Sequence, residues 1–209
     1  MNTAFAEKIS TSILKDEFDL SVDSIRDLNQ ALHSKELTDS IVDWKVSNPG
    51  GQHNIAVGIK APVNVTIDGH AGYYCAGMNQ EAHVIVNGNV GVGVAENMMS
   101  GSVYIKGNAS QAAGATAHGG LLVIEGDAGA RCGISMKGVD IVVGGSIGHM
   151  SCFMGQAGRL VVWVMWYYTL ILSAISGFIS AMPKQVRRIP KVRRWRERVC
   201  RWMNWVVAA

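Results

Sequence analysis

The chain is 209 residues long, which allows one ordinary domain or one domain with an appendage. Its hydrophobic fraction of 48% and charged fraction of 17% exclude a wholly disordered or collagen-like chain. The net charge of +3 conceals an asymmetry, because residues 183–209 contain nine Lys and Arg against one acid, Glu197.

Residues 1–43 are predicted to form an N-terminal segment with one short helix at about 21–33. Val22, Ile25, Leu28, Ala31 and Leu32 share one helical face, and Ser24 and Asp27 have capping-box spacing. We expect this helix to cap the first coil of the domain that follows, although a surface helix with no further role has the same pattern. Because the first thirty residues lack the pattern of a signal peptide, we expect a cytoplasmic protein.

Residues 44–162 carry a repeat of 19 residues. One glycine recurs at this spacing, at Gly50, Gly69, Gly88, Gly107, Gly126 and Gly145. Apolar columns accompany it, one from Val46 through Val65 and Val84 to Leu160, and another from Ile67 to Val162. Each unit therefore resembles a short strand followed by a glycine turn, which needs a positive φ or a close approach between coils. The repeat predicts an all-β fold, a right-handed parallel β-helix with 19-residue coils.

Few residues in the repeat point to catalysis. The run from Gly88 to Gly93 resembles a dinucleotide loop, but another strand rather than a long helix is expected after it. The histidines lack the spacing of a helical metal site, and the four cysteines include no Cys-x-x-Cys pair. Cys75 and Cys132 are expected to be buried small residues too far apart for a disulfide. The glycosylation motifs at Asn64 and Asn108 are interpreted as chance matches.

Three runs of residues carry a family resemblance: 67–80 (IDGHAGYYCAGMNQ), 90–101 (VGVGVAENMMSG) and 109–158. They resemble the GXGXG-motif β-helix family, which includes the domain that closes the large subunit of glutamate synthase and the β-helix subunit of formylmethanofuran dehydrogenase. The chain is most similar to the stand-alone small subunits of the N-methylglutamate synthase type, the GlxC-like proteins, which also resemble it at 24–33 and 48–53.

The resemblance implies a non-catalytic structural subunit of an oxidoreductase complex that acts on glutamate and methylamine. It would bridge a glutamine-amidotransferase-like subunit and an FMN-binding glutamate-synthase-like subunit, and the FMN and iron–sulfur clusters would belong to that partner. We expect no cofactor, metal or catalytic residue in this chain. The predicted partner interface consists of Glu96, Asn97, Met98, Met99, Met136 and Lys137.

Residues 163–209 depart from the family pattern. Residues 161–182 contain no charge, and the basic run follows, so this apolar and then basic tail is expected to be helical and long enough for a membrane anchor. A shifted reading frame is the other explanation, because reading from the third base of the Trp163 codon restores a glycine at position 164, where Val164 stands.

Two further functions remain open at the sequence level. One is a membrane-tethered solenoid that acts through its basic tail, where clustered cations could bind anionic lipid. Such a cluster could also bind nucleic acid, but we expect no nucleic-acid partner. The other is an enzyme that uses its cysteines, for which Cys132→Ala would abolish activity.

Overall fold

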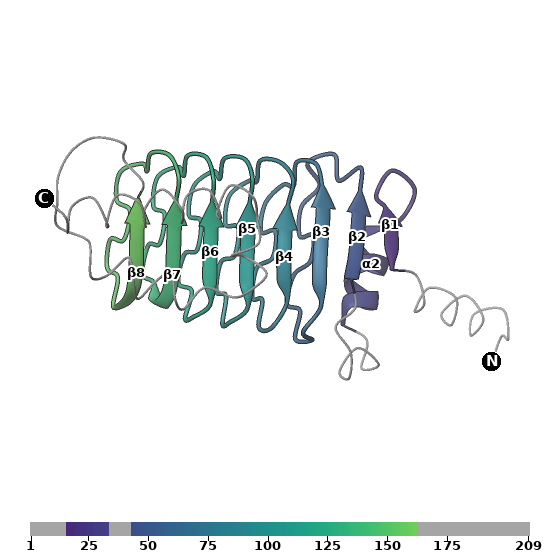
Figure 1. Ribbon diagram of the computed structural model, residues 1–209, viewed down its shortest axis with the longest axis horizontal. Coiled ribbons are helices and arrows are strands. Elements are labelled where there is room, and N and C mark those ends of the chain that lie inside the picture. Colours follow the sequence, from purple (N-terminus) through teal and green to yellow (C-terminus); the bar gives the residue numbers. More distant parts are fainter. Residues whose placement is uncertain (1–15, 34–42, 163–209) are drawn as a thin grey trace, which may run out of the picture. The chain divides into compact units, whose positions relative to one another are not determined.

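The computed structural model describes residues 16–33 and 43–162, which belong to the first of two compact units of the chain, 1–164. Eight strands form one parallel sheet in chain order (Figure 1). They are β1 (Glu17–Asp19), β2 (Asp43–Ser47), β3 (Asn64–Asp68), β4 (His83–Val86), β5 (Ser102–Ile105), β6 (Leu121–Ile124), β7 (Lys137–Val143) and β8 (Ala157–Val162). The single described helix is α2 (Ile25–Leu32). This confirms a parallel β-solenoid with a short N-terminal helix; its hand stays a prediction, and the tail lies outside the described residues.

From β3 onward each coil adds 19 residues, as the pairing of His83 with Ser102 illustrates. Alternate strand residues point into the solenoid, where Val65, Val84, Val103, Leu122 and Ile141 are fully or almost fully buried. Across the coil, a second row of isolated parallel bridges joins Ala71, Val90, Ala109, Ala128 and Ile147. The continuous core therefore lies between the sheet and this second row, because alternate residues of each strand point to the same face of the sheet.

The first coil is longer than the repeat predicts. Asp43 is paired with Asn64, 21 residues further on, so Val65 lies beside Trp44 rather than beside Val46. Continuing this register by one residue places Asn48, not Gly50, level with Gly69. The predicted alignment of Gly50 and Val46 with the later coils was therefore wrong, because two additional residues lie in the loop between β2 and β3.

The helix closes the N-terminal coil. The Ser24 hydroxyl accepts the Asp27 N–H at 3.1 Å, and Leu28, Ala31 and Leu32 are buried in the core. Val22, predicted on the same face, precedes the helix and is 86% exposed. Strand β1 was not predicted; it pairs with β2 and extends the sheet by one strand. The first coil thus has both a helix and an extra strand beside it.

The side of each coil opposite the sheet is a turn with left-handed backbone at alternate residues. In one coil these are Gly93 (φ 74°), Ala95 (φ 54°) and Asn97 (φ 55°). The Gly93 and Asn97 N–H groups donate to the following coil, at 3.0 Å each, whereas the Ala95 N–H donates to the preceding coil at 2.9 Å. The same positions in the next coils are also left-handed, so the turns satisfy backbone groups in both directions.

Candidate functional site

The residues predicted to contact a partner divide between the surface and the core. Met98 is fully buried and Met136 is 7% exposed, so neither presents a side chain to a partner, and this part of the prediction is wrong. The two belong to an interior column that also contains Asn79 and Ala117. Burial of these methionines follows from the coil period, which places residues 19 apart at equivalent positions.

The other members of the predicted interface are accessible at the corner where the turn leads into the next strand. Met99 is 48% exposed, and His118 and Lys137 are exposed at the equivalent positions of the next two coils. Met78, which the sequence reasoning missed, is 45% exposed one coil earlier, at the position equivalent to Asn97. We call Met78, Met99, His118 and Lys137 the corner surface.

Next to the corner surface, side chains from successive coils are linked by hydrogen bonds. The Thr116 hydroxyl donates to Asn97 Oδ1 at 2.6 Å, and Asn97 Nδ2 donates to the Tyr74 hydroxyl at 3.3 Å. Glu96 and Asn97 are partly exposed. The corner surface therefore combines exposed methionines with a fixed polar border, a composition suited to contact with another protein.

Four of the six turn glycines lie against the backbone or side chains of the preceding coil. A Cβ at each would come within 2.1–2.4 Å of an atom there, closer than any real contact; they are Gly88, Gly107, Gly126 and Gly145. Gly69 has φ 140°, and a Cβ there would meet Pro49 Cγ at 2.9 Å, whereas Gly50 has φ 54° and no such close neighbour. At these five positions after Gly50 a side chain would therefore clash with the preceding coil.

Beside these glycines a ladder of polar side chains caps the backbone of successive coils. His70 Nδ1 accepts the Asn89 N–H at 2.9 Å, Asn89 Oδ1 accepts the Asn108 N–H at 2.8 Å, and Asn108 Oδ1 accepts the Asp127 N–H at 2.9 Å. Asp127 continues the ladder by accepting the Ser146 N–H at 2.7 Å. The Gly88–Gly93 run lies within this region and leads to β5, not to a helix. The ladder is a structural element that explains the asparagines of the repeat.

The cysteines of the described coils are poor candidates for nucleophiles. Burial raises the pKa of Cys75 to about 12, and burial, with a smaller contribution from Cys152, raises the pKa of Cys132 to about 12. A thiol needs a lowered pKa to attack as a thiolate near neutral pH. The structure therefore gives no support to the cysteine-based enzyme.

One serine–histidine pair lies on the outer side of the sheet. His83 Nδ1 lies 2.8 Å from the Ser102 hydroxyl, and burial lowers the pKa of His83. Ser102 is only 5% exposed, and in the described part of the chain no carboxylate contacts His83, so the pair lacks the third member of a catalytic triad. Residues 16–33 and 43–162 also contain no group of three His, Cys, Asp or Glu side chains that could hold a metal ion.

Within the described ranges no helix is both long and apolar enough to cross a membrane. The segment predicted as an anchor, 161–182, lies outside these ranges except for Val161 and Val162, which end β8.

Comparison with known proteins finds one match, over part of the chain. Over 61 residues the chain is 58% identical to Protein GlxC of Rhizobium meliloti (strain 1021). The match covers 29% of this chain and 27% of that protein, so it spans only about a quarter of the relative. No family model matches the chain, and no solved structure matches it. The match supports a relation to GlxC, and the solenoid agrees with the β-helix expected for such proteins.

Proposed function

We propose that this chain is a non-catalytic structural subunit of a glutamate-synthase-like oxidoreductase of the N-methylglutamate synthase type. In this proposal the β-helix bridges a glutamine-amidotransferase-like subunit and an FMN-binding glutamate-synthase-like subunit, in the cytoplasm. The observation that carries the proposal is the 58% identity to Protein GlxC over 61 residues. The parallel solenoid supports it, because stacked coils provide long, regular lateral surfaces for two partners.

The corner surface is the part of the solenoid best suited to one of these partners. Its exposed methionine side chains can adapt to the shape of an apolar partner surface. The hydrogen bonds among Thr116, Asn97 and Tyr74 hold the neighbouring side chains in place. Flavin and iron–sulfur chemistry would belong to the FMN-binding partner in this proposal.

Co-expression tests the proposal directly. The full chain carrying an affinity tag is produced with the amidotransferase-like and FMN-binding proteins encoded in the same genome, and the mixture is analysed by size-exclusion chromatography. We expect a ternary complex that forms N-methylglutamate from glutamate and methylamine, and loss of that complex when this chain is omitted. Assembly and full turnover by the other two subunits alone would refute the structural role.

A pair of matched variants locates the interface. Met99→Asp places a charge on the corner surface, whereas Gln111→Asp places one on an exposed position of the opposite corner. We expect Met99→Asp to weaken the complex by roughly tenfold or more, because a charge is then buried against an apolar partner. Equal affinity of the two variants would remove the corner surface from the interface.

A further inference from the structure

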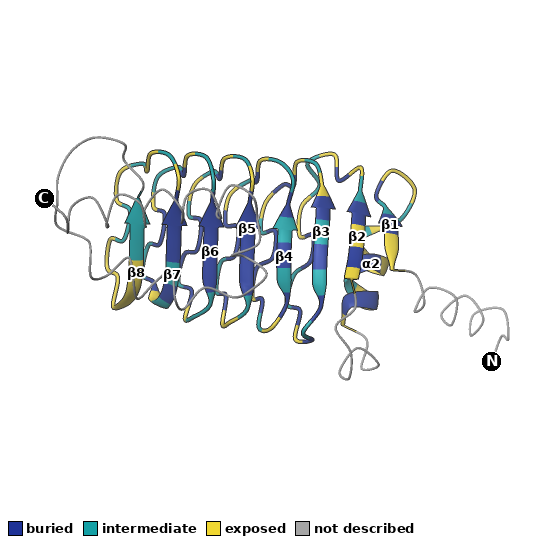
Figure 2. Ribbon diagram, in the orientation of Figure 1, coloured by how far each residue is buried: buried dark blue, intermediate teal, exposed yellow. Residues whose placement is uncertain are grey.

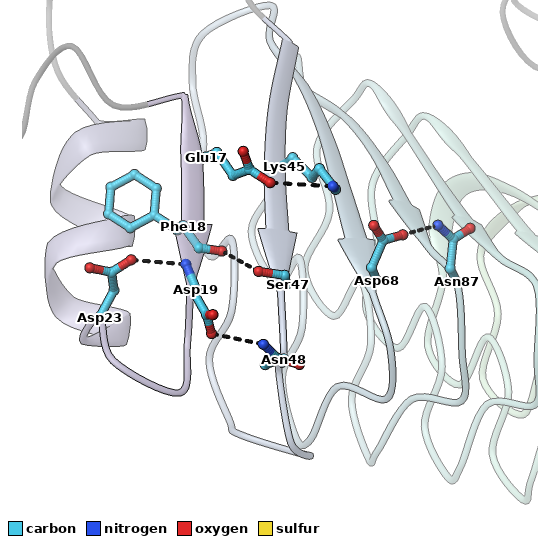
Figure 3. Close-up of polar contacts among 9 residues, drawn as sticks. All are labelled: Glu17, Phe18, Asp19, Asp23, Lys45, Ser47, Asn48, Asp68 and Asn87. Atoms are coloured by element: carbon cyan, nitrogen blue, oxygen red, sulfur yellow. Dashed lines mark hydrogen bonds and ion pairs between the residues drawn. The ribbon is translucent and has the colours of Figure 1, made fainter.

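The last described coil is less covered than the coils before it. Strand β8 is exposed or half-buried along its length, whereas β7 is mostly buried (Figure 2). At the first coil, by contrast, polar contacts tie the chain together: the Asp19 N–H donates to Asp23 at 2.8 Å, and Asn48 donates to Asp19 at 3.0 Å (Figure 3). Leu160 and Val162, which pack on the core from β8, are only partly buried. A small solute can therefore reach the interior of the last described coil.

Three sulfur atoms gather in this accessible interior. The Cys152 N–H donates to the Cys132 carbonyl at 2.8 Å, which places Cys152 beside Cys132 on the next coil. Cys152 Sγ lies 3.7 Å from Met136 Sδ. Besides burial, the neighbouring Cys152 contributes to the raised pKa of Cys132, so the two thiols are close enough to interact. Cys132 is buried and Cys152 is partly exposed. We call Cys132, Met136 and Cys152 the sulfur cluster.

A glycine leaves space beside the sulfur cluster. Gly133 holds the position in its coil that Cys152 holds in the next one. A Cβ on Gly133 would lie 3.2 Å from Met136 Sδ and 3.4 Å from Cys152 Sγ. The residues at the same position of the earlier coils are also small: Ala76, Ala95 and Gly114. The bare Cα of Gly133 therefore leaves a space next to two sulfurs that a side chain would fill.

The distance between the two sulfurs fits two ligands of one metal ion. Metal–sulfur bonds in proteins are about 2.3 Å long, so sulfurs 3.7 Å apart make an angle of about 107° at a shared ion, close to tetrahedral. Thiolate and thioether ligands together select Cu(I). Zn²⁺ instead takes four Cys, His, Asp or Glu ligands, and within residues 16–33 and 43–162 not even three of these gather at one point. The ligand set of the sulfur cluster therefore favours a soft cation.

We propose that the sulfur cluster binds one Cu(I) ion through the thiolates of Cys132 and Cys152 and the thioether of Met136. Each thiol that becomes a ligand releases one proton to solvent, and the copper keeps its oxidation state. The fully buried Ile141 lies against the same space beside Gly133, and such an apolar wall limits the access of water to the ion. This inference is independent of the proposed oxidoreductase role, since the site needs no partner subunit.

Anaerobic titration of the full chain with Cu(I) tests the site, in competition with the coloured chelator bathocuproine disulfonate. Cys200→Ser is present in every sample, so that only the thiols of the described coils are measured. We expect one Cu(I) ion per chain. X-ray absorption at the copper edge of the unaltered coils should show sulfur neighbours at about 2.3 Å.

Matched variants identify the ligands. Cys152→Ala introduces the residue that two earlier coils have at this position, and Met136→Leu removes the thioether at almost constant volume. The controls are Cys75→Ala and Met98→Leu, which change a buried cysteine and a buried methionine of earlier coils. Loss of an outer-shell partner alone weakens metal binding about 10–100-fold, so we expect about a hundredfold or more for Cys152→Ala and about tenfold for Met136→Leu. The controls should keep the unaltered affinity, and circular dichroism verifies that each variant is folded.

Four results would overturn the proposal. Equal Cu(I) affinity of Cys152→Ala and Cys75→Ala would place the copper elsewhere. Copper neighbours that are nitrogen or oxygen only would exclude the sulfur cluster as ligand. Zn²⁺ that competes equally with Cu(I) would exclude a site selective for a soft cation. Absence of Cu(I) binding by the reduced chain, with a disulfide between Cys132 and Cys152 after exposure to air, would make the two thiols a redox pair instead.

Discussion

On the strand side of each coil the core is filled by branched aliphatic side chains, whereas on the turn side it is filled mainly by Ala, Gly and Cys. Leu122 and Ile141 represent the first side, and Ala95, Gly114 and Gly133 represent the second. The strand side is stabilised by apolar burial, and the turn side by backbone hydrogen bonds that left-handed residues donate to neighbouring coils. The two sides should therefore respond differently to changes in side-chain size.

The largest loss is expected on the strand side. Leu122 is fully buried, so Leu122→Ala removes buried methyl groups and leaves a cavity, which costs about 2–5 kcal/mol of unfolding free energy. Urea unfolding followed by circular dichroism measures it. Lys106→Ala, at an exposed position just after β5, is the control and should change stability by less than about 0.5 kcal/mol. Equal losses for both variants would show that burial does not dominate this side.

Enlarging the turn side should cost less than emptying the strand side. Gly114 has φ 65°, and a Cβ there would lie 2.9 Å from Ile141 Cδ1 and 3.1 Å from Leu122 Cδ2. We expect Gly114→Ala to lose about 1–3 kcal/mol in urea unfolding, from overpacking and left-handed strain.

Gly114 on the turn side faces Leu122 on the strand side, so a double variant tests both sides together. In the double variant Leu122→Ala, Gly114→Ala, the new methyl group enters the space that Leu122 leaves. The double variant should therefore lose less stability than the sum of the two single variants. Strict additivity would show that the Gly114 turn and the Leu122 side chain do not share this space.

The difference between the sides also explains what could be predicted from sequence. Strand columns such as Val84, Val103 and Leu122 follow from the 19-residue period and alternate burial. The first register was wrong because Gly50 happens to precede Gly69 by 19 residues, although the first coil is 21 residues long. A glycine spacing alone therefore does not fix the strand register.

The turn side and the candidate interface were harder to predict for a physical reason. Residues such as Ala95, Arg131 and Ser135 adopt positive φ, which their residue types usually avoid, so no local signal marks these turns. Met98 and Met99 are adjacent in sequence, but one is buried and the other is 48% exposed. The direction of a side chain at a coil corner depends on the backbone there, which hydrophobicity does not reveal.

A change to glycine should have opposite signs at two exposed turn positions. Arg131 has φ 63°, so Arg131→Gly relieves left-handed strain and should be neutral or stabilising by up to about 1 kcal/mol. Gln111 is exposed and not left-handed, so Gln111→Gly should lower the unfolding free energy by about 0.5–1 kcal/mol. Differential scanning calorimetry measures both. Equal destabilisation of both variants would contradict the view that backbone geometry governs the turn side.

The smallest effect is expected from titration on the strand side, at His83. Burial lowers the pKa of His83 in the folded state, so below its ordinary value of about 6.5 the unfolded chain binds the proton more readily. The stability that neutral His83 contributes is therefore fully present above about pH 6.5. It is lost as the pH falls from about 6.5 toward the lowered pKa of the folded state. His83→Gln should therefore flatten the decline of unfolding free energy between about pH 7.5 and 5. His118→Gln, an exposed corner-surface variant, is the matched control, and identical pH profiles for the two variants would show that the His83–Ser102 contact does not couple folding to protonation.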